Sequence, residues 1–168
     1  MRRYLLALIA LVAVAAVAVP AFAASRINVP AEFSSKLSRI KDRSNIPVRL
    51  PSRVTSPRPA DEVFGTVEDL GDGEYHLALG VGRNCHESTA CFVASFFAER
   101  GMAPNPAYRQ VDLAQGISGR FRPIRCGASC SAAKVQWRQA GVAYEIQYKG
   151  TRRQMVRLAN SAINAGPR

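Results

Sequence analysis

The sequence predicts the α+β class: an antiparallel sheet of short strands with an N-terminal and a C-terminal amphipathic helix packed on it. Three observations lead to this prediction. One stretch near each end carries an apolar stripe at helical spacing. Short runs of alternating apolar and polar residues lie between them, which is typical of strands with one buried face. Turn residues separate these runs. A β-sandwich with peripheral helices is the alternative architecture.

The N-terminal segment has the features of an export signal. Arg2 and Arg3 precede an apolar run over residues 4–19, and Pro20 is followed by Ala21-Phe22-Ala23, the small-residue pattern of a cleavage site. We therefore expect a signal peptide over residues 1–23 and a single domain over residues 24–168, periplasmic or secreted, with no transmembrane span after cleavage. The alternative is an uncleaved anchor over residues 4–24, which is about long enough to cross a bilayer.

The first half of the predicted domain contains one helix and several short strands. Residues 25–30 are expected to be an extended lead, and residues 31–43 a helix, because Phe33, Leu37 and Ile40 form one stripe. Residues 46–50 and 63–67 are predicted strands, and the proline-containing stretch 51–61 between them a loop. Residues 70–73 form a turn by composition, and residues 74–81 alternate as a strand does.

The second half is predicted to contain a buried strand, two hairpins and a helix. Residues 91–98 are aromatic and β-prone. Residues 108–113 with 117–122, and 134–138 with 142–149, are expected to pair as hairpins. The helix over residues 151–164 has its apolar stripe at Met155, Leu158, Ala159, Ala162 and Ile163, and Gly166-Pro167 ends it.

The four cysteines predict disulfides. An even number of cysteines in a small exported domain is typical of disulfide bonding. Three pairings are possible, and the short spacings within loop-like segments favour Cys85 with Cys91 and Cys126 with Cys130. Zinc binding and redox catalysis are the competing hypotheses. The cysteine spacing is not that of a zinc knuckle, and the C-x-x-C motif of redox catalysts does not occur. We expect no metal and no cofactor.

No catalytic motif stands out. His76 and His86 are the two histidines, and no nucleophile–base arrangement can be argued for either of them from the sequence. G-x-S-x-G, a P-loop and G-x-G-x-x-G are absent. These observations favour a non-enzymatic protein, although an enzyme without a recognisable motif stays an alternative.

The charge pattern points to an anionic partner. The 23 Lys and Arg of the chain fall to 21 once Arg2 and Arg3 leave with the signal peptide, against 12 Asp and Glu. In the predicted hairpins every second residue is apolar, as at Phe121, Val135 and Trp137, and the residues between them are polar. These polar positions include the candidate anion-binding residues, which are Arg120, Arg122, Lys134, Arg138 and Lys149. A merely solvated face, and an arginine-rich composition set by the genome, are the competing explanations.

Two stretches also resemble known proteins. Cys85-x5-Cys91-Phe-Val, together with the stretch from Gly116 through Cys126-Gly-Ala-Ser-Cys130 to the final helix, resembles exported bacterial proteins of this size, some cyanobacterial, for which no activity is known. Trp137-x3-Gly141-x2-Tyr144 followed by a helix is similar to the end of small extracytoplasmic domains in envelope and stress-signalling proteins. Neither resemblance implies a catalytic residue, a cofactor or a substrate.

These observations together predict an exported binding or interaction module with an unknown partner. The more specific alternative is a protein that binds a polyanion or glycan, such as an anionic envelope polymer or lipid, through the arginine-rich sheet face. No nucleic acid is expected as a natural partner, because the chain is predicted to be exported.

Overall fold

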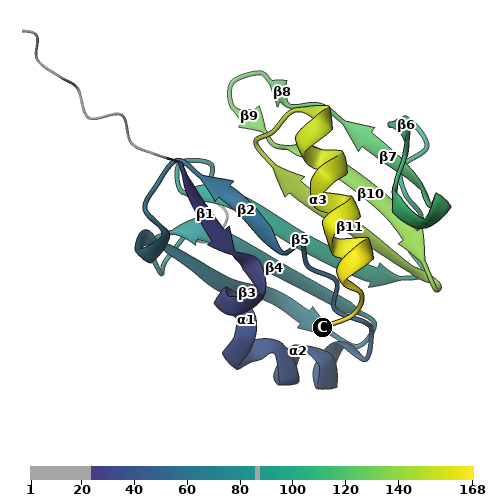
Figure 1. Ribbon diagram of the computed structural model, residues 1–168, viewed down its shortest axis with the longest axis horizontal. Coiled ribbons are helices and arrows are strands. Elements are labelled where there is room, and N and C mark those ends of the chain that lie inside the picture. The colour runs from purple at the N-terminus through teal and green to yellow at the C-terminus, as the bar shows by residue number, and fades with distance from the viewer. Residues whose placement is uncertain (1–23, 86–87) are drawn as a thin grey trace, which may run out of the picture.

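The computed structural model describes residues 24–85 and 88–168. The predicted signal peptide and His86 lie outside these residues. The described part is an α+β fold with a seven-stranded antiparallel sheet, as the sequence predicts, rather than the two facing sheets of a sandwich (Figure 1). The strands of this sheet, in spatial order, are β3 (Val63–Gly71), β4 (Glu74–Val81), β5 (Phe92–Arg100), β11 (Val142–Tyr148), β10 (Ala133–Gln139), β7 (Ser118–Arg122) and β6 (Arg109–Asp112).

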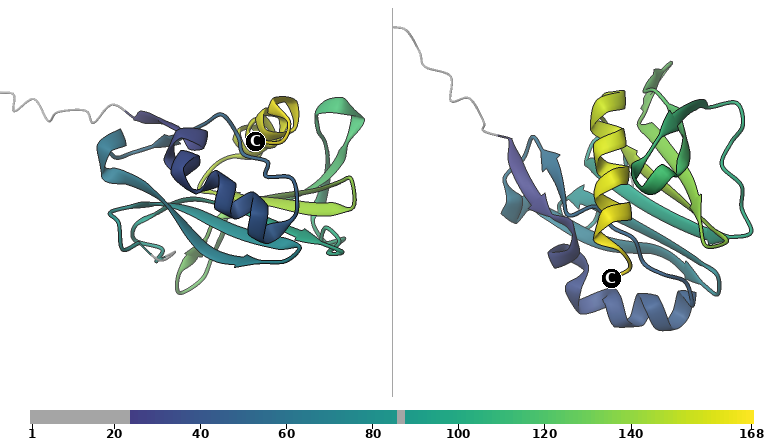
Figure 2. Two further views of the ribbon diagram at one scale, coloured as in Figure 1. Left: turned by 90° about the horizontal axis from the view of Figure 1, so that it is seen from below. Right: turned by 45° about the vertical axis from the view of Figure 1, so that its right-hand side comes forward.

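Two small antiparallel ribbons accompany the main sheet. The first joins β1 (Ser25–Asn28) to β2 (Arg53–Ser56), and the second joins β8 (Arg125–Cys126) to β9 (Cys130–Ser131). The β1–β2 ribbon lies on the helical side of the main sheet (Figures 1 and 2). The β8–β9 ribbon projects from the connection between β7 and β10, and every residue from Pro123 to Ser131 is exposed.

The helices cover one face of the main sheet (Figure 2). The N-terminal pair, α1 (Val29–Phe33) and α2 (Leu37–Ser44), is joined by the 3-10 turn η1 (Ser34–Lys36) and contacts β3. The C-terminal helix α3 (Arg152–Ala165) contacts β10 and β11. Two further 3-10 turns, η2 (Ala60–Glu62) and η3 (Ala114–Gly116), lie in connections. The described residues include no helix long and apolar enough to cross a membrane.

The core lies between the sheet and these helices. Trp137 and Tyr144 are partners across β10 and β11, and their rings stack with centroids 5.3 Å apart. Phe33 of α1 meets Phe96 of β5 edge-on. Gly65 of β3 permits this approach, because a Cβ there would come within 2.9 Å of the Phe33 ring. One aromatic pair therefore joins α1 to the sheet, and the other joins the two strands on which α3 packs.

The start of α3 is fixed by its own sequence. The Thr151 hydroxyl accepts a hydrogen bond from the Gln154 backbone N–H, and the Gln154 side chain accepts one from the Thr151 N–H. This reciprocal capping box satisfies two backbone donors that a helix start leaves open. With Thr151 as the cap, the helix begins at Arg152, one residue after the predicted start.

Three predictions for the first half are wrong in detail. Residues 46–50 form no strand, although Ile46, Val48 and Leu50 are buried alternately as in a strand. Pro47 has no backbone N–H to donate to a neighbouring strand, and the Arg49 N–H donates to the Tyr75 hydroxyl instead. The predicted loop over residues 51–61 contains β2. Its prolines flank that four-residue strand and do not interrupt it, and it pairs with the predicted extended lead.

The single predicted helix over residues 31–43 is also divided. It begins at Val29, two residues earlier than predicted, and the 3-10 turn η1 separates α1 from α2. Phe33 and Ile40 are nevertheless both fully buried, so the helical stripe identified the buried side correctly.

Candidate anion-binding site

The predicted sheet face does bring most of its polar residues together. Across β7, β10 and β11, Gln136 is the register partner of both Arg120 and Glu145. One row further along, Lys134 is the partner of both Arg122 and Gln147. Since cross-strand partners point to the same side of a sheet, these side chains share the face opposite α3.

Glu145 lies at the centre of this face and is only 6% exposed. Its carboxylate accepts hydrogen bonds from Lys134 Nζ and Gln147 Nε2, each at 2.7 Å, and from Gln136 Nε2. The side-chain carbonyl of Gln136 accepts in turn from the Asn105 backbone N–H at 2.7 Å. A buried carboxylate is tolerated in a fold only with partners of this kind.

The arginines on this face also make internal hydrogen bonds. Arg120 Nη1 donates to the Tyr108 carbonyl at 3.3 Å, and Arg122 Nη2 donates to the Ala132 carbonyl at 2.7 Å. The Arg122 guanidinium also lies 5.9 Å from the centroid of the Tyr108 ring. These contacts attach the connection before β6 and the base of the β8–β9 ribbon to the sheet.

The expectation of an evenly solvated face is therefore wrong for its central residues. Gln136 and Glu145 are buried, because the connection over residues 101–108 reaches this face through Asn105 and Tyr108. Arg138 is exposed at the end of β10. Lys149 follows β11, and its ammonium donates to the Thr89 carbonyl at 2.8 Å. Arg120, Arg122 and Lys134 thus contact other parts of the fold, whereas Arg138 and Lys149 are exposed.

A different cationic surface lies on the helical side of the sheet. A groove of about 430 Å³ separates the β1–β2 ribbon from α3. Arg26 comes from β1, Arg53 from β2 and Arg157 from α3. We call this surface the arginine groove, and the residues lining it are Arg26, Arg53, Val54, Thr55, Tyr148, Gln154, Arg157, Leu158 and Ser161.

Two hydrogen bonds hold the walls of the arginine groove in place. The Ser52 N–H donates to Ser161 Oγ of α3 at 3.0 Å, and the Tyr148 hydroxyl donates to the Thr55 carbonyl at 2.9 Å. Partial burial raises the pKa of Tyr148, so this hydroxyl stays protonated and remains a donor at neutral pH. The ribbon register also buries Val54 beneath the groove, which leaves the neighbouring Arg53 exposed.

The electrostatics of the arginine groove favour an anion. Within the described ranges, the side chains of Arg26, Arg53 and Arg157 make no hydrogen bond or ion pair, and no Asp or Glu lines the groove. The chain from Arg100 onward, which forms β6 to β11 and α3, contains twelve Lys and Arg but only Asp112 and Glu145 as acids. Arg157 also lines a neighbouring depression together with Arg152, Arg153 and Asp112. An anion in the groove itself would meet unpaired guanidinium groups, and the lining of the groove contains no carboxylate.

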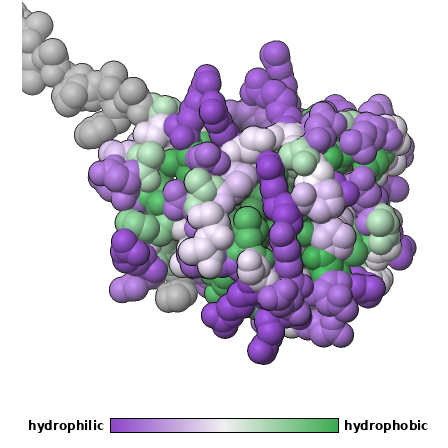
Figure 3. All heavy atoms as spheres, turned by 60° about the horizontal axis from the view of Figure 1, so that its bottom comes forward, coloured by the Kyte–Doolittle hydropathy of each residue, from purple (hydrophilic) through white to green (hydrophobic). Residues whose placement is uncertain are grey.

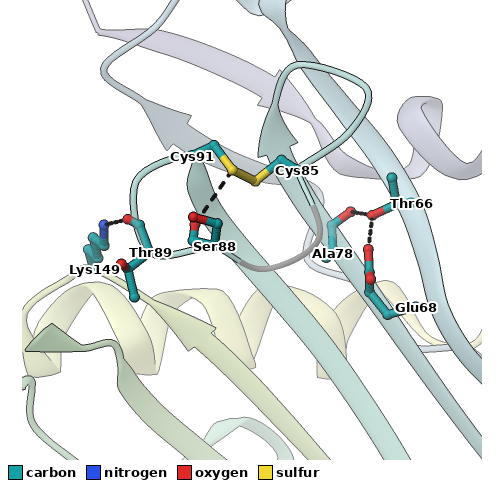
Figure 4. Close-up of a disulfide and its surroundings, with 8 residues drawn as sticks. All are labelled: Thr66, Glu68, Ala78, Cys85, Ser88, Thr89, Cys91 and Lys149. Carbon is teal, nitrogen blue, oxygen red and sulfur yellow. Dashed lines mark hydrogen bonds between the residues drawn. A yellow bond between two sulfur atoms is a disulfide. The ribbon is translucent and has the colours of Figure 1, made fainter. Parts of the chain in front are cut away.

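The two disulfides are the local pairs favoured by the sequence. Cys85 bonds Cys91, and Cys126 bonds Cys130. The first closes the loop between β4 and β5, and Figure 4 shows Lys149, which follows β11, bonded to Thr89 of this loop. Cys85 is only 4% exposed because it packs over Gly80, where a Cβ would meet its sulfur at 2.6 Å. Cys126 and Cys130 are both exposed on the β8–β9 ribbon.

Among the described residues, the remaining candidates do not form a second chemical centre. His76 lies on β4 opposite Phe97, and the two rings meet edge-on at 6.0 Å. No group of three or more His, Cys, Asp and Glu side chains within residues 24–85 and 88–168 could hold a metal ion. Comparison with protein-family models, with curated proteins and with solved structures finds no match to this chain.

Sequence reasoning missed the arginine groove because its parts are far apart in the chain. Arg53 lies in a stretch predicted to be a loop, and Arg26 in the predicted extended lead. The one available signal was on the C-terminal helix, where Arg157 falls outside the apolar stripe. That signal marks an exposed arginine without indicating what lies opposite it.

Proposed function

We propose that this protein is an exported binding module that holds an anionic polymer of the cell envelope in the arginine groove. The observation that carries this proposal is the convergence of Arg26, Arg53 and Arg157 on one groove without a carboxylate among its lining residues. Guanidinium groups suit phosphate, sulfate and carboxylate groups, because each can donate two parallel hydrogen bonds to them.

The wider charge distribution supports the same proposal. The strongly basic second half of the chain would attract a polyanion from a distance, and the arginine groove would fix its position. Figure 3 shows hydrophilic side chains around smaller apolar areas on the face seen from below, as expected for a protein that meets its partner in water. The disulfides are compatible with an oxidising compartment outside the cytoplasm.

The experiment is a calorimetric titration of the purified protein with linear polyphosphate at several salt concentrations. We expect saturable binding that weakens steadily as salt rises, since the polymer must release counterions to bind. The variant Arg26→Gln/Arg53→Gln/Arg157→Gln should bind roughly a hundredfold more weakly, at about 1 kcal/mol for each cation removed.

A matched control removes the same charge elsewhere. Arg39 and Arg43 on α2 and Arg138 on β10 are exposed, so Arg39→Gln/Arg43→Gln/Arg138→Gln has the same net charge as the groove variant. We expect this control to bind nearly as the wild type does. If both triple variants lose affinity equally, binding follows net charge alone and the proposed role of the groove is wrong.

A further inference from the structure

A second cavity adjoins the arginine groove and has a different character. It has a volume of about 390 Å³ and lies between β2, the start of β5 and the end of β11. Its walls are mostly apolar and include Pro57, Phe92, Val93 and the ring of Tyr148. Cys91 also lines the cavity, so the Cys85–Cys91 disulfide fixes one of its walls.

The only charged side chains among its lining residues are cations. Arg58 and Lys149 are the two, and no Asp or Glu lines the cavity within the part of the chain that the structure describes. The hydrogen bond from Lys149 to the Thr89 carbonyl, drawn in Figure 4, holds that ammonium beside the disulfide loop. Thr55 and Tyr148 line both this cavity and the arginine groove, so the apolar and cationic surfaces are neighbours.

We infer that this cavity binds the apolar chain of an anionic amphiphile, with the carboxylate or phosphate head held by Arg58 and Lys149. Small-molecule sites are mostly apolar concavities with a few placed polar groups, and this cavity fits that description. Its volume lies near the lower end of the usual range of about 300–1,000 Å³, which fits one chain better than two. The two cations select an anionic head over a cationic one by charge.

This inference concerns a cavity separate from the arginine groove and does not require the groove to bind a polymer. Ala90 makes the distinction testable, because it lines the apolar cavity and not the groove. A tryptophan at this position would fill the cavity, whereas the arginines of the groove would be unchanged. Ala128, exposed on the β8–β9 ribbon, provides a matched position for the same substitution away from the cavity.

The experiment is a calorimetric titration of the purified protein with monomeric decyl phosphate. We expect saturable binding of one molecule per chain, and at least tenfold weaker binding of decyltrimethylammonium, which has the same chain but a cationic head. Inorganic phosphate, which lacks the chain, should also bind at least tenfold more weakly. Ala90→Trp should lower the affinity for decyl phosphate at least tenfold, and Ala128→Trp should leave it unchanged.

The other variants and probes separate the explanations. Arg58→Gln/Lys149→Gln should weaken decyl phosphate binding about tenfold, while Arg39→Gln/Arg43→Gln should not. An unchanged thermal unfolding midpoint and an unchanged circular dichroism spectrum of Ala90→Trp would show that the fold is intact. Equal binding of the two decyl compounds, or full affinity in Ala90→Trp, would overturn the inference.

Vesicles of phosphatidylglycerol identify the source of the amphiphile. If the protein sediments with them and Ala90→Trp abolishes this, the chain of a membrane lipid enters the cavity. If the wild-type protein does not sediment but binds decyl phosphate, the ligand is a free amphiphile. Sedimentation that Ala90→Trp leaves unchanged, together with loss of the preference for decyl phosphate, would show adsorption to the surface and contradict the inference.

Discussion

Two cationic regions of this protein differ in what their side chains contact. On the sheet face, Arg120 and Arg122 donate to backbone carbonyls, and Lys134 pairs with the buried Glu145. In the arginine groove, Arg26, Arg53 and Arg157 have no such partners among the described residues. The difference shows that cations gathered on one surface need not have side-chain donors available to a ligand. The proposed binding site is therefore the region whose donors remain available.

The same difference separates residues that stabilise the fold from residues that bind. A cation that compensates a buried carboxylate contributes to folding, and its loss leaves that carboxylate without its counter-charge. An exposed cation without a partner contributes little to folding and can bind a ligand at a small conformational cost. Substitutions in the two regions should therefore change different measured quantities.

The largest effect on stability should follow Lys134→Met. This change keeps much of the aliphatic stem of Lys134 but removes the ammonium that pairs with Glu145, whose side chain is 7% exposed. We expect the free energy of unfolding, measured with urea, to fall by about 3 kcal/mol. Binding of polyphosphate should change by less than about twofold, since Lys134 is not in the groove.

A second substitution tests the cause of that loss. In Lys134→Met/Glu145→Gln the buried charge is also removed, so we expect at least half of the lost stability to return. Additive losses in the double variant would mean that the ion pair does not explain the effect.

Arg122→Met should have an intermediate effect. It removes the hydrogen bond to the Ala132 carbonyl that attaches the base of the β8–β9 ribbon to β7. We expect a loss of about 1.5–2 kcal/mol, because hydrogen bonds from charged donors contribute more than neutral ones. Amide hydrogen exchange should become faster in residues 123–132. Arg138→Met, at an exposed position on the same sheet, is the control and should leave exchange there unaltered.

The smallest effect on stability should come from the groove itself. Arg26→Gln/Arg53→Gln/Arg157→Gln changes three exposed side chains that have no internal partner among the described residues. The unfolding free energy should change by no more than about 0.5 kcal/mol for each substitution. A loss of several kcal/mol in urea unfolding would show that these arginines support the fold, and the contrast between the two regions would fail.

Much of the fold could be predicted from local patterns. Alternation marked β4 and β11, and a helical stripe marked α3, because each of these elements buries one side of a continuous stretch of chain. The pairing of nearby cysteines and the shared side of Arg120, Lys134 and Gln136 also followed from spacing. All of these features depend on residues that are close in sequence or joined by a short turn.

The arrangement of the candidate sites depends on contacts that no local pattern encodes. The pairing of β5 with β11 brings Phe92 and Tyr148 to the same end of the sheet, where both line the apolar cavity. The arginine groove requires the β1–β2 ribbon to lie beside α3, more than a hundred residues later. The burial of Glu145 could not be predicted either, because an alternating strand gives no sign of the connection that covers its polar side.

A backbone amide NMR titration of the protein with linear polyphosphate tests the arginine groove most directly. We expect the largest shift changes on β1, β2 and the first two turns of α3, around Arg26, Arg53 and Arg157. Amides of β7 and β10, around Arg120, Arg122 and Lys134, should change little. If the largest changes fall on β7 and β10 instead, the polyanion binds the sheet face and the arginine groove is not its binding site.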